Sequence, residues 1–86
     1  MRHPNGGDPG TRRLLQTFGR DLREARRRAG LSQRAVAQRL GVSQSYVSLV
    51  ERGLRDPPLS SMGAFAEALG YELTVAFRPV PPALNR

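Results

Sequence analysis

The sequence predicts a small, mostly α-helical domain of four helices that ends in one β-strand. Three observations support this prediction. Apolar residues recur at spacings of three and four along most of the chain, and serines and glycines bracket the periodic segments. After residue 70, a two-residue alternation replaces the helical period. A chain of 86 residues has room for one domain with a limited core.

The N-terminal part divides into an arm and a long helix. Residues 1–10 hold two Pro and three Gly without apolar periodicity, which predicts a flexible arm. A helix is expected from Thr11 to Ala29, with Gly30 as its C-terminal cap. Its apolar positions follow helical spacing: Leu14, Leu15, Phe18, Leu22, Ala25 and Ala29.

Two short helices follow, each preceded by a serine that can cap it. Ser32 begins a helix that buries Val36, Ala37 and Leu40 and ends at Gly41. Ser43 begins the next, which runs to about Arg52 and stops at Gly53. Because a glycine in the left-handed conformation turns the chain sharply, the two helices must cross at a large angle, as in a helix-turn-helix.

The last helix and the strand are distinguished by their periods. Ser60 is expected to cap a fourth helix that ends at Gly70, with one face formed by Met62, Phe65, Ala66 and Leu69. Residues 71–78 then alternate as a strand, whose apolar face holds Tyr71, Leu73, Val75 and Phe77, and a Pro-rich tail covers residues 79–86. No other segment is predicted as a strand. We therefore expect this one to pair antiparallel with the same strand of a second copy, forming a homodimer.

Charge is distributed unevenly. The net charge is +7, and residues 1–58 hold twelve of the fourteen Arg against five of the seven acidic residues. Such a basic region favours a polyanionic partner, of which double-stranded DNA is the expected one. By charge alone an anionic membrane surface also fits, through the arginines of the first helix, but the narrow apolar stripe of that helix is needed for the core.

Several function classes find no support in the sequence. There is no cysteine, and the single histidine, His3, has no second ligand nearby, so neither a disulfide nor a metal site is expected. We also find no nucleophile motif, phosphate-binding glycine loop or carboxylate pair, which argues against an enzyme and against a cofactor. No apolar run is long enough for a membrane span or a signal core, so a cytoplasmic, nucleoid-associated protein is expected.

The outer face of the third helix is polar but almost uncharged. Val47 and Val50 define its buried direction, and the face pointing away holds Gln44, Ser45, Ser48, Leu49 and Arg52. Glutamine can bond adenine in a bidentate manner, and serine can reach a base or a phosphate. Gln44, Ser45 and Ser48 are therefore candidates for reading bases. The alternative is that these three residues only complete the capped N-terminus of a helix.

The surroundings of this face favour phosphate contacts. Gln33 and Gln44 lie in the first turns of their helices, where free backbone N–H groups attract anions. Nearby basic and hydroxyl side chains would position a duplex without reading its sequence. The candidate contacts to the DNA backbone are Gln33, Arg34, Arg39, Ser43, Arg52 and Arg55.

The run from Leu22 to Leu69 resembles the phage-repressor-like helix-turn-helix family, of the Cro and C1 type, also called XRE. The most specific pieces are GLSQ at 30–33, LGVS at 40–43, and VS at 47–48 followed by VERG at 50–53 and by Pro57. The resemblance implies that Gln44, Ser45 and Ser48 face bases, and that Gln33 braces the DNA backbone and Gln44. It also implies a structural ion pair between Glu51 and Arg26.

Two departures from the family pattern are visible. Leu49 occupies a position that is usually polar or basic, so it would contact a thymine methyl or belong to a protein interface. A strand also takes the place of the fifth helix of phage repressors, and this ending of a helix followed by a strand resembles antitoxins of the HipB type. The expected function is a sequence-specific transcriptional repressor that binds an inverted-repeat operator as a homodimer. The alternative is a module that mainly binds and neutralises a toxin protein.

Overall fold

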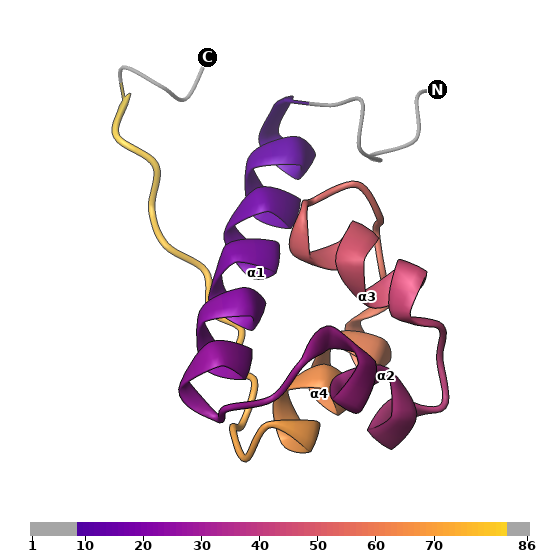
Figure 1. The fold of residues 1–86 in the computed structure, drawn as a ribbon. Coiled ribbons are helices and arrows are strands. Elements are labelled where there is room, and N and C mark those ends of the chain that lie inside the picture. The colour runs from indigo at the N-terminus through magenta and orange to yellow at the C-terminus, as the bar shows by residue number, and fades with distance from the viewer. Residues whose placement is uncertain (1–8, 83–86) are drawn as a thin grey trace.

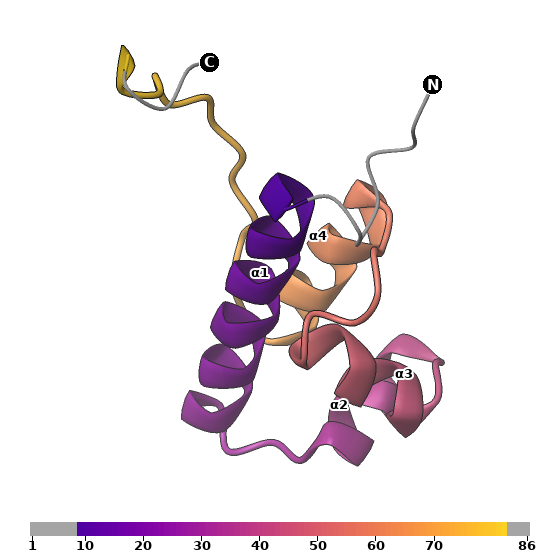
Figure 2. The same ribbon diagram turned by 90° about the horizontal axis from the view of Figure 1, so that it is seen from above.

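The computed structural model describes residues 9–82, in which four helices confirm the predicted mostly α-helical class. The helices are α1 (Pro9–Arg28), α2 (Gln33–Leu40), α3 (Gln44–Glu51) and α4 (Leu59–Ala68). The long α1 lies along one side of the molecule, and the three short helices gather beside it (Figures 1 and 2). Most of the predicted arm, residues 1–8, and residues 83–86 of the predicted tail lie outside the described part.

The turn between α2 and α3 forms as the sequence predicts. The hydroxyl oxygens of Ser32 and Ser43 accept hydrogen bonds from the backbone N–H groups of Ala35 and Tyr46, each at 3.0 Å. Gly41 ends α2 with a φ of 69°, a left-handed conformation that costs a residue without Cβ little. The chain therefore reverses within a few residues, and α3 packs across α2 as the second helix of a helix-turn-helix.

The first helix begins two residues before the expected start at about Thr11, and the predicted cap of the fourth helix is wrong. Pro9 and Gly10 belong to the first turn of α1 rather than to the arm, because proline needs no N–H partner at that position. Ser60 does not cap α4, which begins at Leu59 with Pro58 as the N-cap residue and no side-chain cap. The fixed φ of Pro58 sets the helix entry, and its carbonyl accepts from the Met62 N–H at 3.0 Å.

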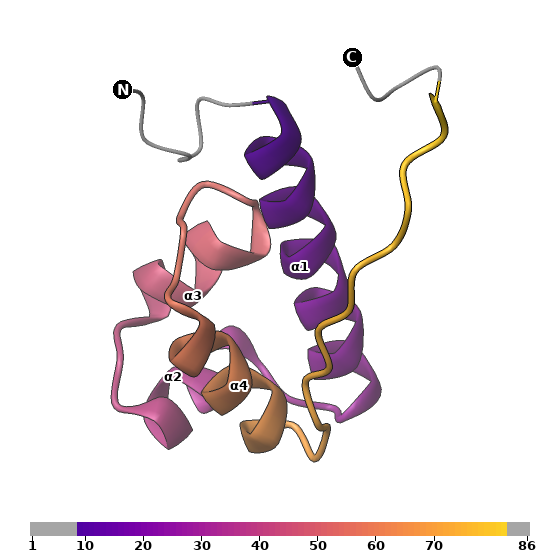
Figure 3. The same cartoon turned by 180° about the vertical axis from the view of Figure 1, so that it is seen from behind.

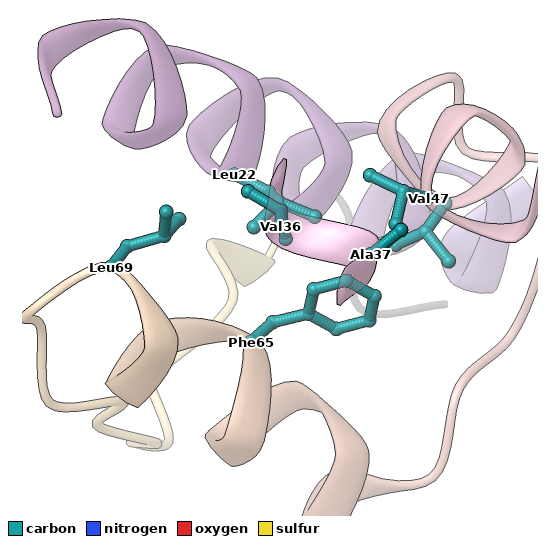
Figure 4. Packing of buried hydrophobic residues seen from close by; sticks show 7 residues of the cluster. Leu22, Val36, Ala37, Val47, Phe65 and Leu69 are labelled. Carbon is teal, nitrogen blue, oxygen red and sulfur yellow. The ribbon is translucent and has the colours of Figure 1, made fainter. Parts of the chain in front are cut away.

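The core lies where the four helices meet. Leu22 from α1, Val36 and Ala37 from α2, Val47 from α3 and Phe65 from α4 converge (Figure 4). Val36 and Val47 are completely buried, and Phe65 is almost so. Removing this apolar surface from water is the main drive that holds α2 and α3 at their crossing angle.

Helices α1 and α3 approach each other more closely than ordinary side chains permit. Gly19 faces the C-terminal end of α3, and a Cβ at this residue would lie 2.5 Å from the carbonyl oxygens of Val50 and Glu51. Only glycine fits such a contact between helix backbones without displacement. Gly19 therefore sets the position of α3 relative to α1.

The chain after Gly70 extends back along α1, on the side away from α3 (Figures 1 and 3). Residues 71–81 form no strand in the single copy that the structure describes. Strand pairing needs backbone partners, which this chain alone does not offer, so the strand and the dimer pairing stay predictions. Of the predicted apolar face, Leu73 is half-buried, while Tyr71, Val75 and Phe77 are exposed.

Candidate nucleic-acid interface

A concave surface runs along the outer side of α3, and we call it the reading groove. Gln44 and Ser45 in it are exposed, and Ser48 and Leu49 are half-buried. Its complete lining consists of Gln33, Gln44, Ser45, Ser48, Leu49 and Arg52. Five of these six side chains are uncharged, and four of them carry hydrogen-bonding groups. The structure thus brings the three predicted base-reading residues into one surface with two of the predicted backbone contacts.

The sequence of α3 explains why this face points outward. Val47 and Val50 are buried and fix the opposite face against the core. At about 100° per residue, Ser45 and Ser48 then point away from that core. The hydroxyl of Ser43 accepts from the Tyr46 N–H and holds the first turn of the helix, which leaves Gln44 at the open end.

A buried carboxylate ties the reading groove to α1. Glu51 is buried, and its carboxylate accepts hydrogen bonds from the Arg26 guanidinium, with Nη2 to Oε1 at 3.1 Å, and from Gln33 Nε2 at 3.0 Å. The ion pair that the family resemblance implies is thus present, and Arg26 also donates to the carbonyl of Leu31 at 2.9 Å. Because one carboxylate bridges α1, α2 and α3, it fixes how the three helices meet.

The ionisation of Glu51 follows from these contacts. Burial by itself would raise the pKa of this carboxyl group, but the hydrogen bonds from Arg26 and Gln33 and the charges of Arg26 and Arg23 hold the pKa below its ordinary value. Glu51 is therefore an anion at neutral pH. The side chain of Gln33 is engaged here, with Glu51, and not with Gln44 as the family resemblance implies.

The remaining predicted backbone contacts are spread over the molecule. Arg34 and Arg52 are exposed. The Arg39 guanidinium donates to the carbonyl of Ala68 at 2.8 Å, so it satisfies the C-terminal end of α4. The Arg55 guanidinium lies over the ring of Tyr46, 5.7 Å from its centroid. Only Gln33 and Arg52 of the predicted backbone contacts line the reading groove itself.

Sequence reasoning missed two residues beside the site. Gly19 was passed over, although a glycine four residues after Leu15, on the buried face of a helix, costs helix stability and so indicates a close approach. Arg23 lies with its Nε 3.6 Å from Glu51 Oε1, which adds a third cationic or amide group around that carboxylate. The sequence offers one signal for this contact: Arg23 is three residues from Arg26, so the two side chains lie on the same face of a helix.

None of the helices within residues 9–82 is both long and apolar enough to cross a membrane. Over the same residues, no three His, Cys, Asp or Glu side chains come together as metal ligands would.

Comparison with known proteins identifies the family of this domain. Residues 17–75 match a family described as a helix-turn-helix domain. Two uncharacterized HTH-type transcriptional regulators of Sinorhizobium fredii are similar to this chain: y4dL is 39% identical over 64 residues, and y4dJ is 42% identical over 57 residues. The alignments cover 74% and 66% of this chain, and 33% and 74% of the two relatives. The chain thus spans about a third of the length of y4dL.

Solved structures give the same fold. The clp gene regulator ClgR from C. glutamicum superposes with a TM-score of 0.68 and 30% identity, over 70% of this chain and 77% of that one. The restriction-modification controller protein C.AhdI from Aeromonas hydrophila does so with a TM-score of 0.64 and 45% identity, over 67% and 88%. With the reading groove and the capped turn in place, this chain belongs to the XRE-type helix-turn-helix family of DNA-binding domains.

Proposed function

We propose that this chain is a transcriptional regulator, a repressor, that reads the major groove of its operator with α3. The observation that carries the proposal is the reading groove, whose short uncharged side chains lie beside the N-terminal turns of α2 and α3. Such side chains can approach base edges closely, while free N–H groups at helix N-termini attract phosphate. The names of the relatives and of both solved neighbours, all regulators or controllers, support the same function.

Each residue of the groove has a proposed role. Gln44, Ser45 and Ser48 read bases, and Leu49 contacts a thymine methyl. Phosphates are held in and around the groove by the half-buried Gln33 and by four exposed residues, which position the duplex without reading it: Arg34, Ser43, Arg52 and Arg55. Arg39 is left out of this set, because its guanidinium already serves the C-terminal end of α4.

The first experiment measures binding of duplex DNA by fluorescence anisotropy over a range of salt. About six arginine–phosphate contacts per dimer predict a slope near five in log K against log salt. Affinity that stays flat between about 50 and about 200 mM salt would show that the basic surface does not hold phosphates.

The proposed assembly is a homodimer formed by residues 71–78. Val75 is 68% exposed, and Phe77 is fully exposed, so the single chain leaves much of this apolar face uncovered. Antiparallel pairing with a second copy would supply backbone partners along one edge and cover these side chains. Two α3 helices related by a two-fold axis would then meet major grooves about 34 Å apart, on an inverted-repeat operator.

Light scattering tests this assembly. Val75→Asp and a chain truncated after Leu69 are expected to be monomeric at micromolar concentration. Ala76→Asp adds the same charge at the neighbouring position, on the other side of the predicted strand, and is expected to stay dimeric. If Val75→Asp and the truncated chain both remain dimeric, the subunits associate through the helices instead.

A second candidate function is neutralisation of a partner toxin by the same segment. The fully exposed Phe77 favours it, because an exposed aromatic side chain is a common anchor in protein interfaces. The test is co-purification of this chain with the product of the neighbouring gene. A stable complex that Phe77→Ala disrupts supports this function. If no complex co-purifies, residues 71–78 serve the homodimer instead.

A further inference from the structure

The outer side of α1 carries a row of arginines that the reading groove does not use. Arg20, Arg23 and Arg27 lie within about 60° of one another around the helix, at about 100° per residue. We call these three residues the arginine strip. Arg20, Arg23 and Arg27 line one shallow concave surface on α1, together with Glu24 and Arg28.

The charges of the strip are poorly compensated. Within residues 9–82, Arg20 pairs only with the exposed Asp21, with Nε to Oδ1 at 3.9 Å. Arg23 lies 3.6 Å from Glu51, but the charge of that carboxylate is already matched by Arg26. Arg27 forms no ion pair with any acidic residue in the part of the chain that the structure describes. Glu24, which lines the same surface, pairs with Arg28 at 3.6 Å.

This arrangement costs stability in the free protein. Like charges three and four residues apart on a helix repel each other, and Arg20, Arg23 and Arg27 have these spacings. A polyanion bound along the strip would convert that repulsion into attraction. The strip is therefore better explained by a ligand than by the fold.

The arginine strip lies next to the reading groove at Arg23. Glu51 Oε1 accepts from Gln33 Nε2 at 3.0 Å and also lies 3.6 Å from Arg23 Nε. Gln33 lines the groove, so one carboxylate oxygen separates the groove from Arg23, the middle arginine of the strip. A rod-like polyanion seated in the groove would need only to continue past Glu51 to reach Arg23 and Arg27.

We propose that the arginine strip is a second phosphate-binding surface, which holds the duplex DNA that flanks the operator half-site. The proposal rests on the proposed function of the reading groove. It favours DNA over a membrane because a helix that lies on lipid exposes an apolar face beside its basic one. The exposed apolar residue of α1, Leu14, lies on the far side of the helix from the strip.

The test compares two duplexes that carry the same site, selected from a random library. One ends at the edges of the site, and the other continues for about ten base pairs, one helical turn, on each side. The 86-residue chain, the variant Arg20→Gln/Arg27→Gln and the control Arg39→Gln are titrated with both. The control removes a positive charge outside the strip, from an arginine whose guanidinium donates to the carbonyl of Ala68.

Wild type and control are expected to bind the longer duplex more tightly and with a steeper salt dependence. In the strip variant, two lost phosphate contacts per protomer, four per dimer, reduce the salt slope on the longer duplex by about 3.6. Its deficit against wild type is therefore expected to shrink about 150-fold between about 50 and about 200 mM salt. Its melting temperature is expected to be no lower than that of wild type, because repulsion in α1 is relieved.

Three results would overturn the proposal. Equal affinity of wild type for both duplexes refutes the arginine strip alone, while the reading groove stands. Failure of wild type to bind either duplex refutes the proposed function and the strip together. If the strip variant loses binding to phosphatidylserine vesicles but keeps the full gain from flanking DNA, the strip is a membrane surface.

Discussion

Replacing Gly19 by alanine tests the contact that positions α3. In most helix interiors, alanine in place of glycine stabilises by about 1 kcal/mol, because the unfolded chain loses freedom. At residue 19 the new Cβ would lie 2.5 Å from two carbonyl oxygens of α3. An ordinary C···O contact is about 3.3 Å or longer, so α1 and α3 must separate by roughly 0.8 Å. Overpacking of this kind costs about 1–3 kcal/mol, so the net loss is expected to be up to about 2 kcal/mol.

Gly63→Ala in α4 is the matched control, because a Cβ there has no neighbour within 4 Å. It is expected to stabilise by about 1 kcal/mol. Both variants are unfolded by urea and by heat and followed by far-UV circular dichroism, where each kcal/mol moves the melting temperature by about 4–8 °C. The two substitutions should thus shift it in opposite directions. A stabilised Gly19→Ala would refute the close approach of the two helices.

Three further outcomes follow from the structure. Glu51→Gln is expected to lose about 3 kcal/mol of stability, because it leaves the half-buried Arg26 charge unpaired. Because the pKa of Glu51 is lowered in the folded state, its contribution to the free energy of unfolding is fully present above the ordinary pKa of about 4.3 and is lost as the pH falls through the lower folded pKa. The free energy of unfolding, measured in urea as a function of pH, is therefore expected to fall over this range in wild type but not in Glu51→Gln. Equally flat curves for the two proteins would contradict this. Ser43→Ala should cost about 1 kcal/mol and Ser60→Ala almost nothing, since only Ser43 caps a helix, and equal losses would contradict the assignment. Gln44→Ala is expected to cost about 1–3 kcal/mol on the preferred duplex and to relax the choice at one base pair, whereas equal loss on random DNA would make it a phosphate contact.

Local signals predicted most of the fold because they report local physics. The serine caps at residues 32 and 43 and the turn at Gly41 follow from hydrogen bonding and backbone sterics within a few residues. Ser60 does not cap α4, because Pro58, two residues earlier, already fixes the entry to the helix with its restricted φ. Where two local signals compete within one turn, the sequence pattern alone does not rank them.

The features that could not be predicted depend on partners far apart in the chain. Arg39 and Arg55 are indistinguishable from other surface arginines until folding brings them to Ala68 and Tyr46. The same holds for the contact that requires Gly19, whose partners lie about thirty residues away. The strand at residues 71–78 requires backbone groups that the single chain does not supply, so only an assembly can test it.

The most direct test of the proposed function is selection of duplexes from a random library by the 86-residue chain, read by sequencing. Reading by two α3 helices related by a two-fold axis predicts enrichment of an inverted repeat, with half-site centres about 10 bp or a multiple of that apart. Gln44→Ala in a parallel selection should lose its preference at one symmetric pair of positions. Recovered duplexes without any shared sequence would contradict the account, because binding would then rest on phosphates alone.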